Sequence, residues 1–167
     1  MPLVKGNHIV QDGFVTIGED DALPVSGAIL LPAARLLQDP SVVERPWPVG
    51  VIWPNNRDID ELVPHLPVLS AVALVFPSFR DGRAYTQARL LRERHRYRGE
   101  LRATGQVLRD QFVFMLRAGF DAFEVVKQSD AEAFFSVTRR YSVFYQPTAE
   151  TPITAFHRRM MAHRKSV

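Results

Sequence analysis

The residues best suited to chemistry in this chain are arginines that follow apolar runs, where strands would give way to loops. Arg57, Arg80 and Arg83 hold such positions, and Asn55 and Ser78 lie in the same two loops. A guanidinium presents planar N–H forks that match carboxylate, phosphate and sulfur oxyanions. Amide and hydroxyl groups supply further hydrogen-bond donors. We therefore predict that these side chains bind a small anion.

The arginine content supports this interpretation without fixing it. The chain has 18 arginines but only 3 lysines, and ten of the arginines lie between Arg80 and Arg117. A GC-rich genome would raise the overall arginine content without any functional cause. For each loop arginine the alternative is a surface salt bridge, with Asp81 capping a helix. The clustering favours the anion site.

A second feature is the mixed character of the segment GELRAT, residues 99–104. In an extended strand Glu100, Arg102 and Thr104 share one face. A strand buried between layers should be almost wholly apolar, so these charges indicate an edge strand, a buried ion pair or a polar pocket. In a pocket, Arg102 would be a further anion ligand.

The segment FDAFEVV, residues 120–126, repeats this character with Asp121 and Glu124. Glu124 is expected to pair with Arg102 if the two strands are neighbours. Alternatively Glu100, Asp121 or Glu124 acts as a catalytic acid or base in a pocket, which requires a raised carboxyl pKa.

Several classes of function are excluded or disfavoured. The absence of cysteine excludes disulfides and cysteine-ligated iron–sulfur clusters. The histidines lack metal-ligand spacing, so no metal site is predicted, and no glycine-rich nucleotide motif identifies a cofactor. No apolar run approaches the roughly 20 residues of a membrane span, and no signal peptide is evident, so a cytoplasmic protein is expected. Arginines 89, 92 and 96 follow helical spacing, which favours a solvated face over a nucleic-acid site.

Alternation of strand and helix patterns positions these residues. Strands are predicted at 49–54, 72–77, 99–104 and 120–126, with a fifth at 141–147, and helices at 55–66, 83–95, 107–119 and 129–140. This order predicts a mostly parallel α/β sheet of four to five strands with flanking helices, first as an open doubly wound sheet. The alternative is a partial, barrel-like βα repeat, since these units are too few for a closed eight-stranded barrel.

The two ends of the chain are predicted to be appendages of a single domain. Residues 1–47 alternate around Asp12-Gly13, which predicts a small β-hairpin or arm, followed by a short helix with Leu30 and Leu31 on its apolar stripe. Residues 48–147 form the α/β core. Residues 148–167 form a basic C-terminal tail.

The blocks FPSFRDGRAYTQARLLRER, GELRATG, VLRDQ and GFDAFEV resemble a bacterial family of uncharacterised proteins encoded beside the assimilatory sulfite reductase hemoprotein. Members are often labelled putative oxidoreductases of sulfite reduction. The resemblance implies a cytoplasmic accessory to sulfite reduction, with the reductase as a partner. We thus expect an auxiliary protein that binds a small oxyanion or docks to the reductase through its strand-end arginines. The alternatives are an enzyme acting on a small anion and a flavin- or nicotinamide-dependent oxidoreductase.

Overall fold

The computed structural model describes residues 2–6, 8–127, 129–132 and 134–135. Its described residues form one sheet of eight strands, in the spatial order β2-β1-β8-β7-β6-β5-β4-β3. The strands are β1 (Leu3–Lys5), β2 (His8–Val10), β3 (Phe14–Thr16), β4 (Ala28–Pro32), β5 (Val49–Trp53), β6 (Ala71–Phe76), β7 (Glu100–Gly105) and β8 (Ala122–Glu124).

Short helices join the strands. The α-helices are α1 (Ala33–Gln38), α2 (Arg83–Arg89) and α3 (Phe112–Ala118), and α2 runs directly into a π-helical turn, η4 (Leu90–Arg94). The 3-10 turns are η1 (Pro40–Glu44), η2 (Ile59–Glu61), η3 (Val63–His65) and η5 (Arg109–Gln111). Residues 129–132 and 134–135 are also helical.

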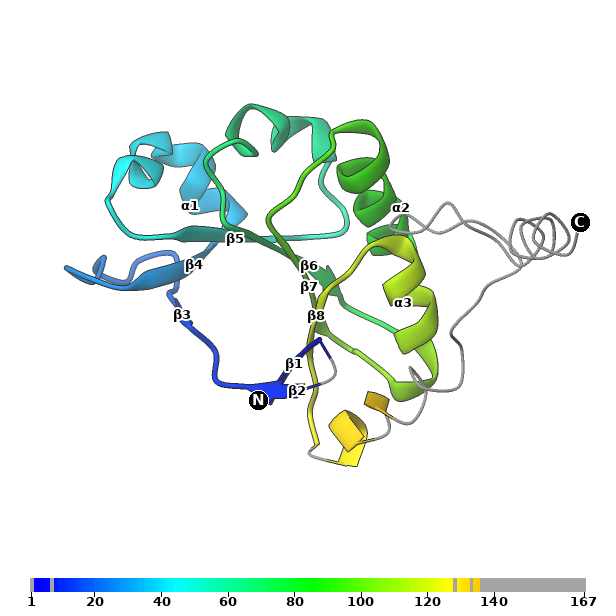
Figure 1. Ribbon diagram of the computed structural model, residues 1–167. Helices are drawn as coiled ribbons and strands as arrows, with labels where there is room; N and C mark the ends of the chain where they lie inside the picture. Colours follow the sequence, from blue (N-terminus) through cyan, green and yellow to red (C-terminus); the bar gives the residue numbers. More distant parts are fainter. Residues whose placement is uncertain (1, 7, 128, 133, 136–167) are drawn as a thin grey trace, which may run out of the picture.

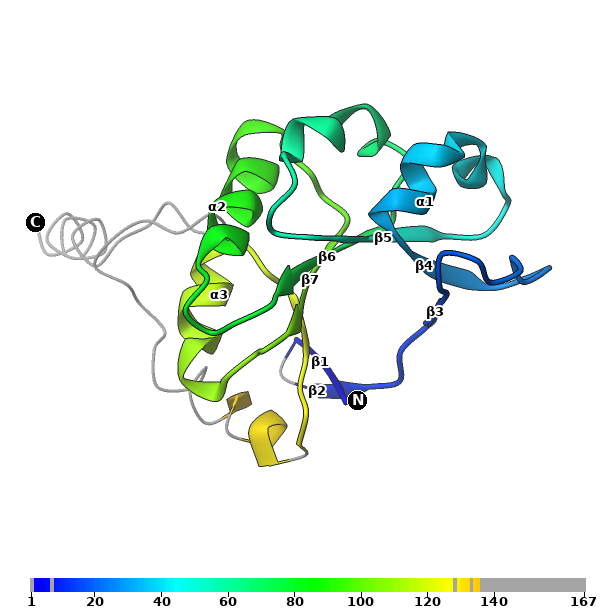
Figure 2. The ribbon, with the colours of Figure 1, turned by 180° about the vertical axis from the view of Figure 1, so that it is seen from behind.

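The sheet is curled into a half-barrel (Figures 1 and 2). Strands β3 to β8 are parallel, whereas β1 runs antiparallel to both β8 and β2. The two edge strands of the sheet, β2 and β3, are consecutive in the chain and only residues 11–13 separate them. Because so short a segment spans at most about 14 Å, it draws the two edges of the curled sheet towards each other.

Helices α1, α2 and α3 cover the outer, convex face of this sheet (Figure 1). The mixed α/β class and the mostly parallel sheet are therefore confirmed, and the barrel-like alternative fits. The preferred open doubly wound sheet is wrong, and the sheet has more strands than the predicted four to five.

The curvature has a steric cause on the inner face. Gly50 of β5 pairs with Ala71 of β6, and Ala73, which pairs with Ile52, lies two residues further along the same face, so small residues gather there. Even so, a Cβ atom on Gly50 would lie 2.8 Å from Leu30 Cδ1 and 2.9 Å from Ala71 Cβ. The outer face carries large side chains from the same strands, including Trp53 and Phe76, in the main core. A sheet with small residues on one face and large ones on the other curls towards the small side.

Strand β7 and its neighbours bury apolar side chains under α2 and α3. Leu101 and Ala103 of β7 belong to the outer core together with Phe112 and Met115 of α3. The rings of Phe112 and Phe123 meet edge to face at 5.7 Å, a favourable aromatic geometry. The strands predicted at 49–54, 72–77, 99–104 and 120–126 all form, with shifts of one or two residues at their ends.

The N-terminal predictions need correction. A small N-terminal hairpin does form, from the antiparallel strands β1 and β2, but the turn predicted at Asp12-Gly13 does not join two paired strands, because β3 pairs with β4. Leu30 and Leu31 lie on strand β4 rather than on a helix, and α1 begins only after Pro32. Proline lacks the N–H that a helix interior requires, so it marks this boundary.

Two predicted helices are also modified. The helix expected at 55–66 consists of the two 3-10 turns η2 and η3, with Pro64 inside the second. Helix α3 ends as predicted at Gly119, whose φ of 103° is the left-handed conformation favoured by glycine. The fifth strand predicted at 141–147 and the tail at 148–167 lie outside the described residues.

Candidate functional site

Arg102 occupies the inner face of the curled sheet, where it is completely buried. Its guanidinium donates to both carboxylate oxygens of Asp12, at 2.6 and 3.0 Å. It also donates to Glu100 at 2.9 Å and to Glu124 at 3.0 Å. The ring of Phe14 lies 5.6 Å from the guanidinium carbon. Charge-assisted bonds to three carboxylates make Arg102 a fully partnered buried group.

Two further side chains extend this interior cluster. The Thr104 hydroxyl donates to the second oxygen of Glu124. Lys5, which is half exposed, donates to Glu100 at 2.9 Å. The predicted Arg102–Glu124 pair across neighbouring strands is confirmed, and so is the buried ion pair interpretation of the mixed strand. Together the carboxylates use the donors of Arg102 that an external anion would need.

The electrostatics of the cluster follow from these contacts. Burial acts to raise the pKa of Asp12, but the Arg102 hydrogen bonds, the Phe14 N–H and the nearby positive charge outweigh it, so this pKa is lowered. Burial disfavours the charged form of Arg102, yet its bonds to Asp12, Glu100 and Glu124 raise its pKa above the ordinary value. Asp12 and Arg102 are therefore both ionised at neutral pH.

Asp121 lies apart from this cluster, before the amino end of β8. It accepts from the Leu101 N–H at 2.9 Å and from Arg92 at 2.8 Å. Burial raises the pKa of Asp121, while the Leu101 N–H and Arg92 offset part of that rise. Arg92 also donates to the carbonyls of Tyr97, Gly99 and Gly119. The expectation that Arg92 belongs to a solvated face is wrong, since its side chain is 10% exposed.

A different group forms where the loops after β5 and β6 meet, at the carboxyl end of the sheet. Arg83 makes a two-pronged ion pair with Asp81, through Nε at 3.0 Å and Nη2 at 2.6 Å. This pairing, with smaller contributions from the Arg83 N–H and the Asn55 side chain, holds the pKa of Asp81 well below its usual range. Asn55 is therefore close to the Asp81–Arg83 pair.

The loop that carries Asn55 is held in place by helix α2. The Gln87 side-chain amide donates to the carbonyls of Pro54 and Arg57, at 3.2 and 2.9 Å. In this region three buried polar atoms have no hydrogen-bond partner among the described residues: Trp53 Nε1, Asn55 Nδ2 and Gln87 Oε1. Buried donors and acceptors are normally paired by protein, water or ligand, so these three atoms leave hydrogen-bonding capacity unused beside the loop.

The remaining loop residues are more exposed. Arg57 pairs with Glu61 at 2.9 Å and lies over the Trp53 ring, 5.7 Å from its centre. Arg80 lies over the exposed ring of Phe79, at 5.4 Å, and has no carboxylate partner in the described part of the chain. The Ser78 hydroxyl accepts from the Arg80 N–H at 3.4 Å, so it serves the turn.

The structure thus separates the predicted site residues into groups. Arg102, Glu100 and Glu124 lie in the interior cluster, Asp121 lies at the amino end, and Asn55 and Arg83 lie together at the carboxyl end. Asp12 and Arg92 were missed as key partners. Asp12 was interpreted as a hairpin turn residue, and its contact with Arg102, 90 residues away, leaves no local signal.

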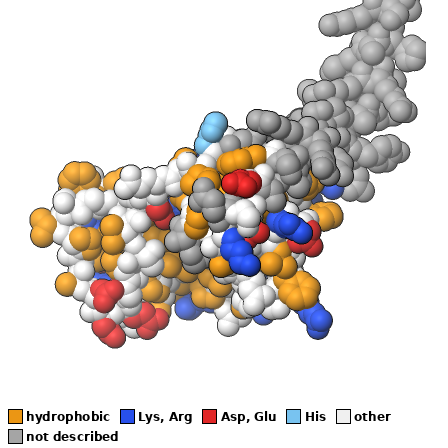
Figure 3. Space-filling model, turned by 90° about the horizontal axis from the view of Figure 1, so that it is seen from below, with side chains coloured by type: hydrophobic (Ala, Val, Ile, Leu, Met, Phe, Trp, Pro, Cys, Tyr) orange, Lys and Arg blue, Asp and Glu red, His pale blue; other side chains and the backbone are white. Residues whose placement is uncertain are grey.

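Two other properties concern partners and ions. Among the described residues, no group of three or more potential ligands is arranged to hold a metal ion. Within the same ranges, no helix has the length and hydrophobicity needed to cross a membrane. Seen from below, one group of acidic side chains lies at the lower left of the molecule, and further right Lys and Arg side chains lie among other acidic ones (Figure 3).

These features define a class of protein: a curled, one-sided α/β half-barrel with a partnered polar interior and arginine-bearing loops at its carboxyl end. Residues 50–156 match the family model described as a bacterial protein of unknown function, DUF934, and the chain belongs to this family. The matched range begins at the second residue of β5 and includes β6 to β8. Comparison with curated proteins gives no match.

Proposed function

We propose that the protein is an accessory of assimilatory sulfite reduction that binds a small oxyanion between the loops after β5 and β6. The pathway is suggested by the resemblance of the central blocks to the family encoded beside the reductase. The ligand class is suggested by Asn55 and Arg83, which lie together at the carboxyl end of parallel strands. Ligands of parallel α/β sheets commonly bind at that end, both in open sheets and in barrels.

The observation that carries the proposal is the buried Asn55 amide. Asn55 is 7% exposed, and its Nδ2 makes no direct hydrogen bond among the described residues, although the Asn55 side chain lies near the Asp81 carboxylate and helps to lower its pKa. An oxyanion would accept from Asn55 and from the Arg83 guanidinium at the same time. Asp81 already binds this guanidinium, so the incoming oxyanion competes with a carboxylate of the protein itself.

This competition gives a test with opposite signs. In calorimetric titrations with sulfite, R83Q and N55A each lose a donor to the anion and should weaken binding about tenfold or more. D81N removes the competing charge and should strengthen it about threefold or more, since Arg83 is released. R89Q, an exposed arginine on the outer helix, is the matched control and should bind like the wild type.

Equal affinities for the wild type, R83Q and D81N would rule out this site. Sulfate and phosphate titrations would then separate a sulfite site from a general oxyanion site. In a cell that depends on sulfate as its sulfur source, deletion of the gene should slow growth. Three genes would then be returned to the deletion strain: the wild type, D81N and R83Q. They should restore growth to different extents.

Docking to the reductase is a second candidate, favoured by Phe79 and Arg80. Phe79 is 48% exposed and carries the Arg80 guanidinium over its ring. Exposed aromatic and arginine side chains are enriched among residues that dominate protein interfaces. F79A should then reduce association with purified reductase while leaving sulfite affinity unchanged, and equal association would remove this candidate.

The two remaining alternatives have no specific observation in their favour. A carboxylate enzyme would use Glu100, Asp121 or Glu124, each of which is paired with an arginine in the structure. A flavin- or nicotinamide-dependent oxidoreductase stays a prediction, tested by the absorbance spectrum of the protein with and without added cofactor.

A further inference from the structure

The segment from Arg89 to Arg98 carries five arginines with different environments. Arg89 forms an exposed ion pair with Glu93 at 3.2 Å, and Arg92 is buried and holds four acceptors. The other three, Arg94, Arg96 and Arg98, are exposed and have no carboxylate partner among the described residues. Uncompensated positive charge is therefore concentrated in the loop 94–98, which leads to the amino end of β7.

The backbone of this loop is fixed from beneath. His95 N–H donates to the Leu90 carbonyl at 3.0 Å, which closes the π turn, and Tyr97 N–H donates to the Leu91 carbonyl at 2.8 Å. The Tyr97 side chain is buried and its hydroxyl donates to the Leu69 carbonyl. His95 and Tyr97, whose N–H groups are hydrogen-bonded, thus alternate with the exposed arginines. A loop ordered in advance loses less conformational entropy when it binds.

Arg96 has a backbone conformation that its side chain does not favour. Its φ is 53°, and it is the only non-glycine residue with positive φ among those described. This left-handed region favours glycine and asparagine. An arginine at such a position is a backbone outlier, a feature that clusters at functional sites. The π turn just before it is another such feature.

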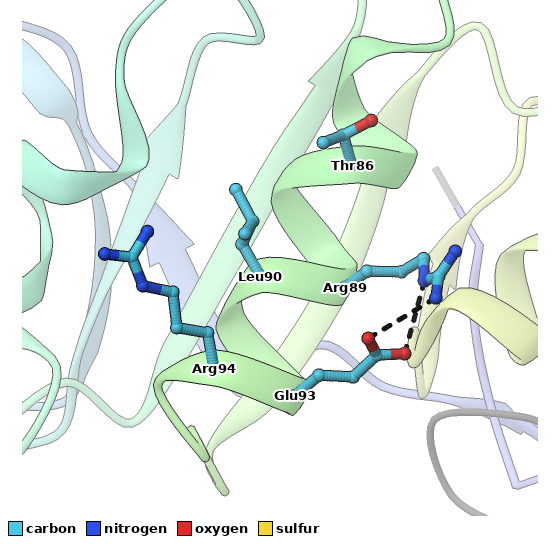
Figure 4. Close-up of a pocket in the computed structure, with 5 residues that line it drawn as sticks. All are labelled: Thr86, Arg89, Leu90, Glu93 and Arg94. Atoms are coloured by element: carbon cyan, nitrogen blue, oxygen red, sulfur yellow. Dashed lines mark hydrogen bonds and ion pairs between the residues drawn. The ribbon is translucent and has the colours of Figure 1, made fainter.

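A shallow depression adjoins the loop on the outer face of α2 and η4. It is lined by Thr86, Arg89, Leu90, Glu93 and Arg94. In Figure 4, Leu90 and Arg94 project to one side of the helix, while the paired Arg89 and Glu93 project to the other. A half-buried leucine therefore lies next to the first of the unpaired arginines.

We propose that the loop 94–98 and the depression over Leu90 form a docking surface for an acidic protein partner. Carboxylates of the partner would pair with Arg94, Arg96 and Arg98, and an apolar side chain would contact Leu90. Guanidinium forks match carboxylates in geometry and charge. A nucleic acid fits this surface less well, because Tyr97, the loop's aromatic residue, is buried and cannot stack on a base.

This surface lies at the amino end of the strands, whereas the loops of Asn55 and Arg83 lie at the carboxyl end. The two inferences are therefore independent. A variant without the loop arginines should still bind sulfite with wild-type affinity if the oxyanion proposal is right. Failure of one proposal leaves the other intact, and separate titrations distinguish them.

The test uses a fluorescent peptide of glutamates around a single leucine, with binding followed by anisotropy. R94Q/R96Q/R98Q should weaken binding about tenfold, since each exposed charge pair contributes modestly. L90S should weaken it about threefold, and a peptide with serine for leucine should bind the wild type equally weakly. R57Q/E61Q, which removes an exposed ion pair of the same i, i+4 kind outside this surface, is the matched control and should bind the peptide like the wild type.

R96G separates binding from folding. Glycine suits the left-handed backbone, so its thermal midpoint should not fall, while affinity for the peptide should fall about twofold or more. Wild-type affinity in the triple variant would overturn the proposal. Stronger competition by tripolyphosphate or by single-stranded DNA of equal charge, with no effect of L90S, would overturn it in favour of a general polyanion site.

Discussion

Arg102 and Arg92 are both largely buried, yet opposite sides of the sheet hold them by different means. Arg102, on the inner face, is surrounded by the carboxylates of Asp12, Glu100 and Glu124. Arg92, outside the sheet, donates to three backbone carbonyls and to a single carboxylate, Asp121. The interior contact therefore depends mainly on charge, and the outer contact depends mainly on the shape of the guanidinium fork.

The difference teaches which changes each region can tolerate. Removing a buried positive charge leaves uncompensated carboxylates, a larger penalty than the net value of the ion pair itself. Replacing one cation by another keeps the charge but loses the planar fork. Substitutions that remove the positive charge should therefore lower stability most at Arg102. Substitutions that keep the charge but lose the planar fork should lower stability most at Arg92.

The largest effect is expected for R102M. It leaves the half-buried carboxylates of Glu100 and Glu124, and the more exposed one of Asp12, without their buried cation, which should lower the free energy of unfolding by about 3–5 kcal/mol. Urea denaturation measures this loss. Adding D12N and E124Q to R102M should recover part of it, because the repulsion between carboxylates falls. The same substitution at the outer arginine, R92M, should cost less. If R102M is less destabilising than R92M, charge does not matter more in the interior than outside the sheet.

The next effect is expected for R92K. Lysine keeps the charge but cannot reach the four acceptors of Arg92 at once, so about 2 kcal/mol of stability should be lost. R89K is the matched control on the same helical segment and should change stability by less than about 0.5 kcal/mol. If R92K unfolds at the same urea concentration as R89K, the fork geometry does not matter.

A smaller effect is expected for D12N. The substitution weakens the two charge-assisted bonds that tie residues 11–13 to Arg102, at a cost of about 1–2 kcal/mol. Amide hydrogen exchange should rise in β2 and β3, on either side of this segment. D20N, in an exposed loop, should leave exchange there unchanged, and an equal rise in both variants would contradict a specific role for Asp12.

The smallest effect concerns pH, and the two regions should respond with opposite signs. The pKa of Asp12 is lowered in the folded protein from an ordinary value of 3.8, so its stabilisation is present above that value and is lost as pH falls below it. The pKa of Asp121 is raised from 3.8, so its contribution is present below that value and is lost as pH rises through the folded pKa.

Urea titrations between about pH 2.5 and 6 can separate these two slopes. D12N should reduce the loss of stability that occurs as pH falls below 3.8, the ordinary pKa of an aspartate. D121N should remove the loss of stability that occurs as pH rises above that value. An unchanged profile in D12N would show that Arg102 does not control the ionisation of Asp12.

Much of the fold was predictable because its signals are local. The apolar alternation of β5 to β8 identifies each strand, and alternation also places Glu100, Arg102 and Thr104 on one face. The Arg102–Glu124 pair followed once β7 and β8 were taken as neighbours. The proximity of Asn55 and Arg83 followed from the loop positions alone, since carboxyl ends of parallel strands meet at one edge.

The rest depends on relations between distant residues. Gly50, Ala71 and Ala73 produce curvature only when the strand register places them together on one face. Helical spacing gave the wrong environment for Arg92, because the π turn at Leu90–Arg94 and the turn after it bring distant carbonyls to its guanidinium. Asp12 was predicted to be a turn residue because it precedes Gly13. Its contact with Arg102, 90 residues away, could not be seen in the local sequence.

The closure of the curled sheet also has a consequence for the order in which the chain folds. Strand β1 pairs with β8, and Asp12 meets a partner 90 residues further along. A ribosome releases the N-terminal strands long before β8 exists, so β1 and β2 wait without their main neighbour while β4 to β7 assemble. Unpaired strands of this kind are prone to mispairing. Completion of β8 is therefore the step at which the nascent chain can bury its first residues.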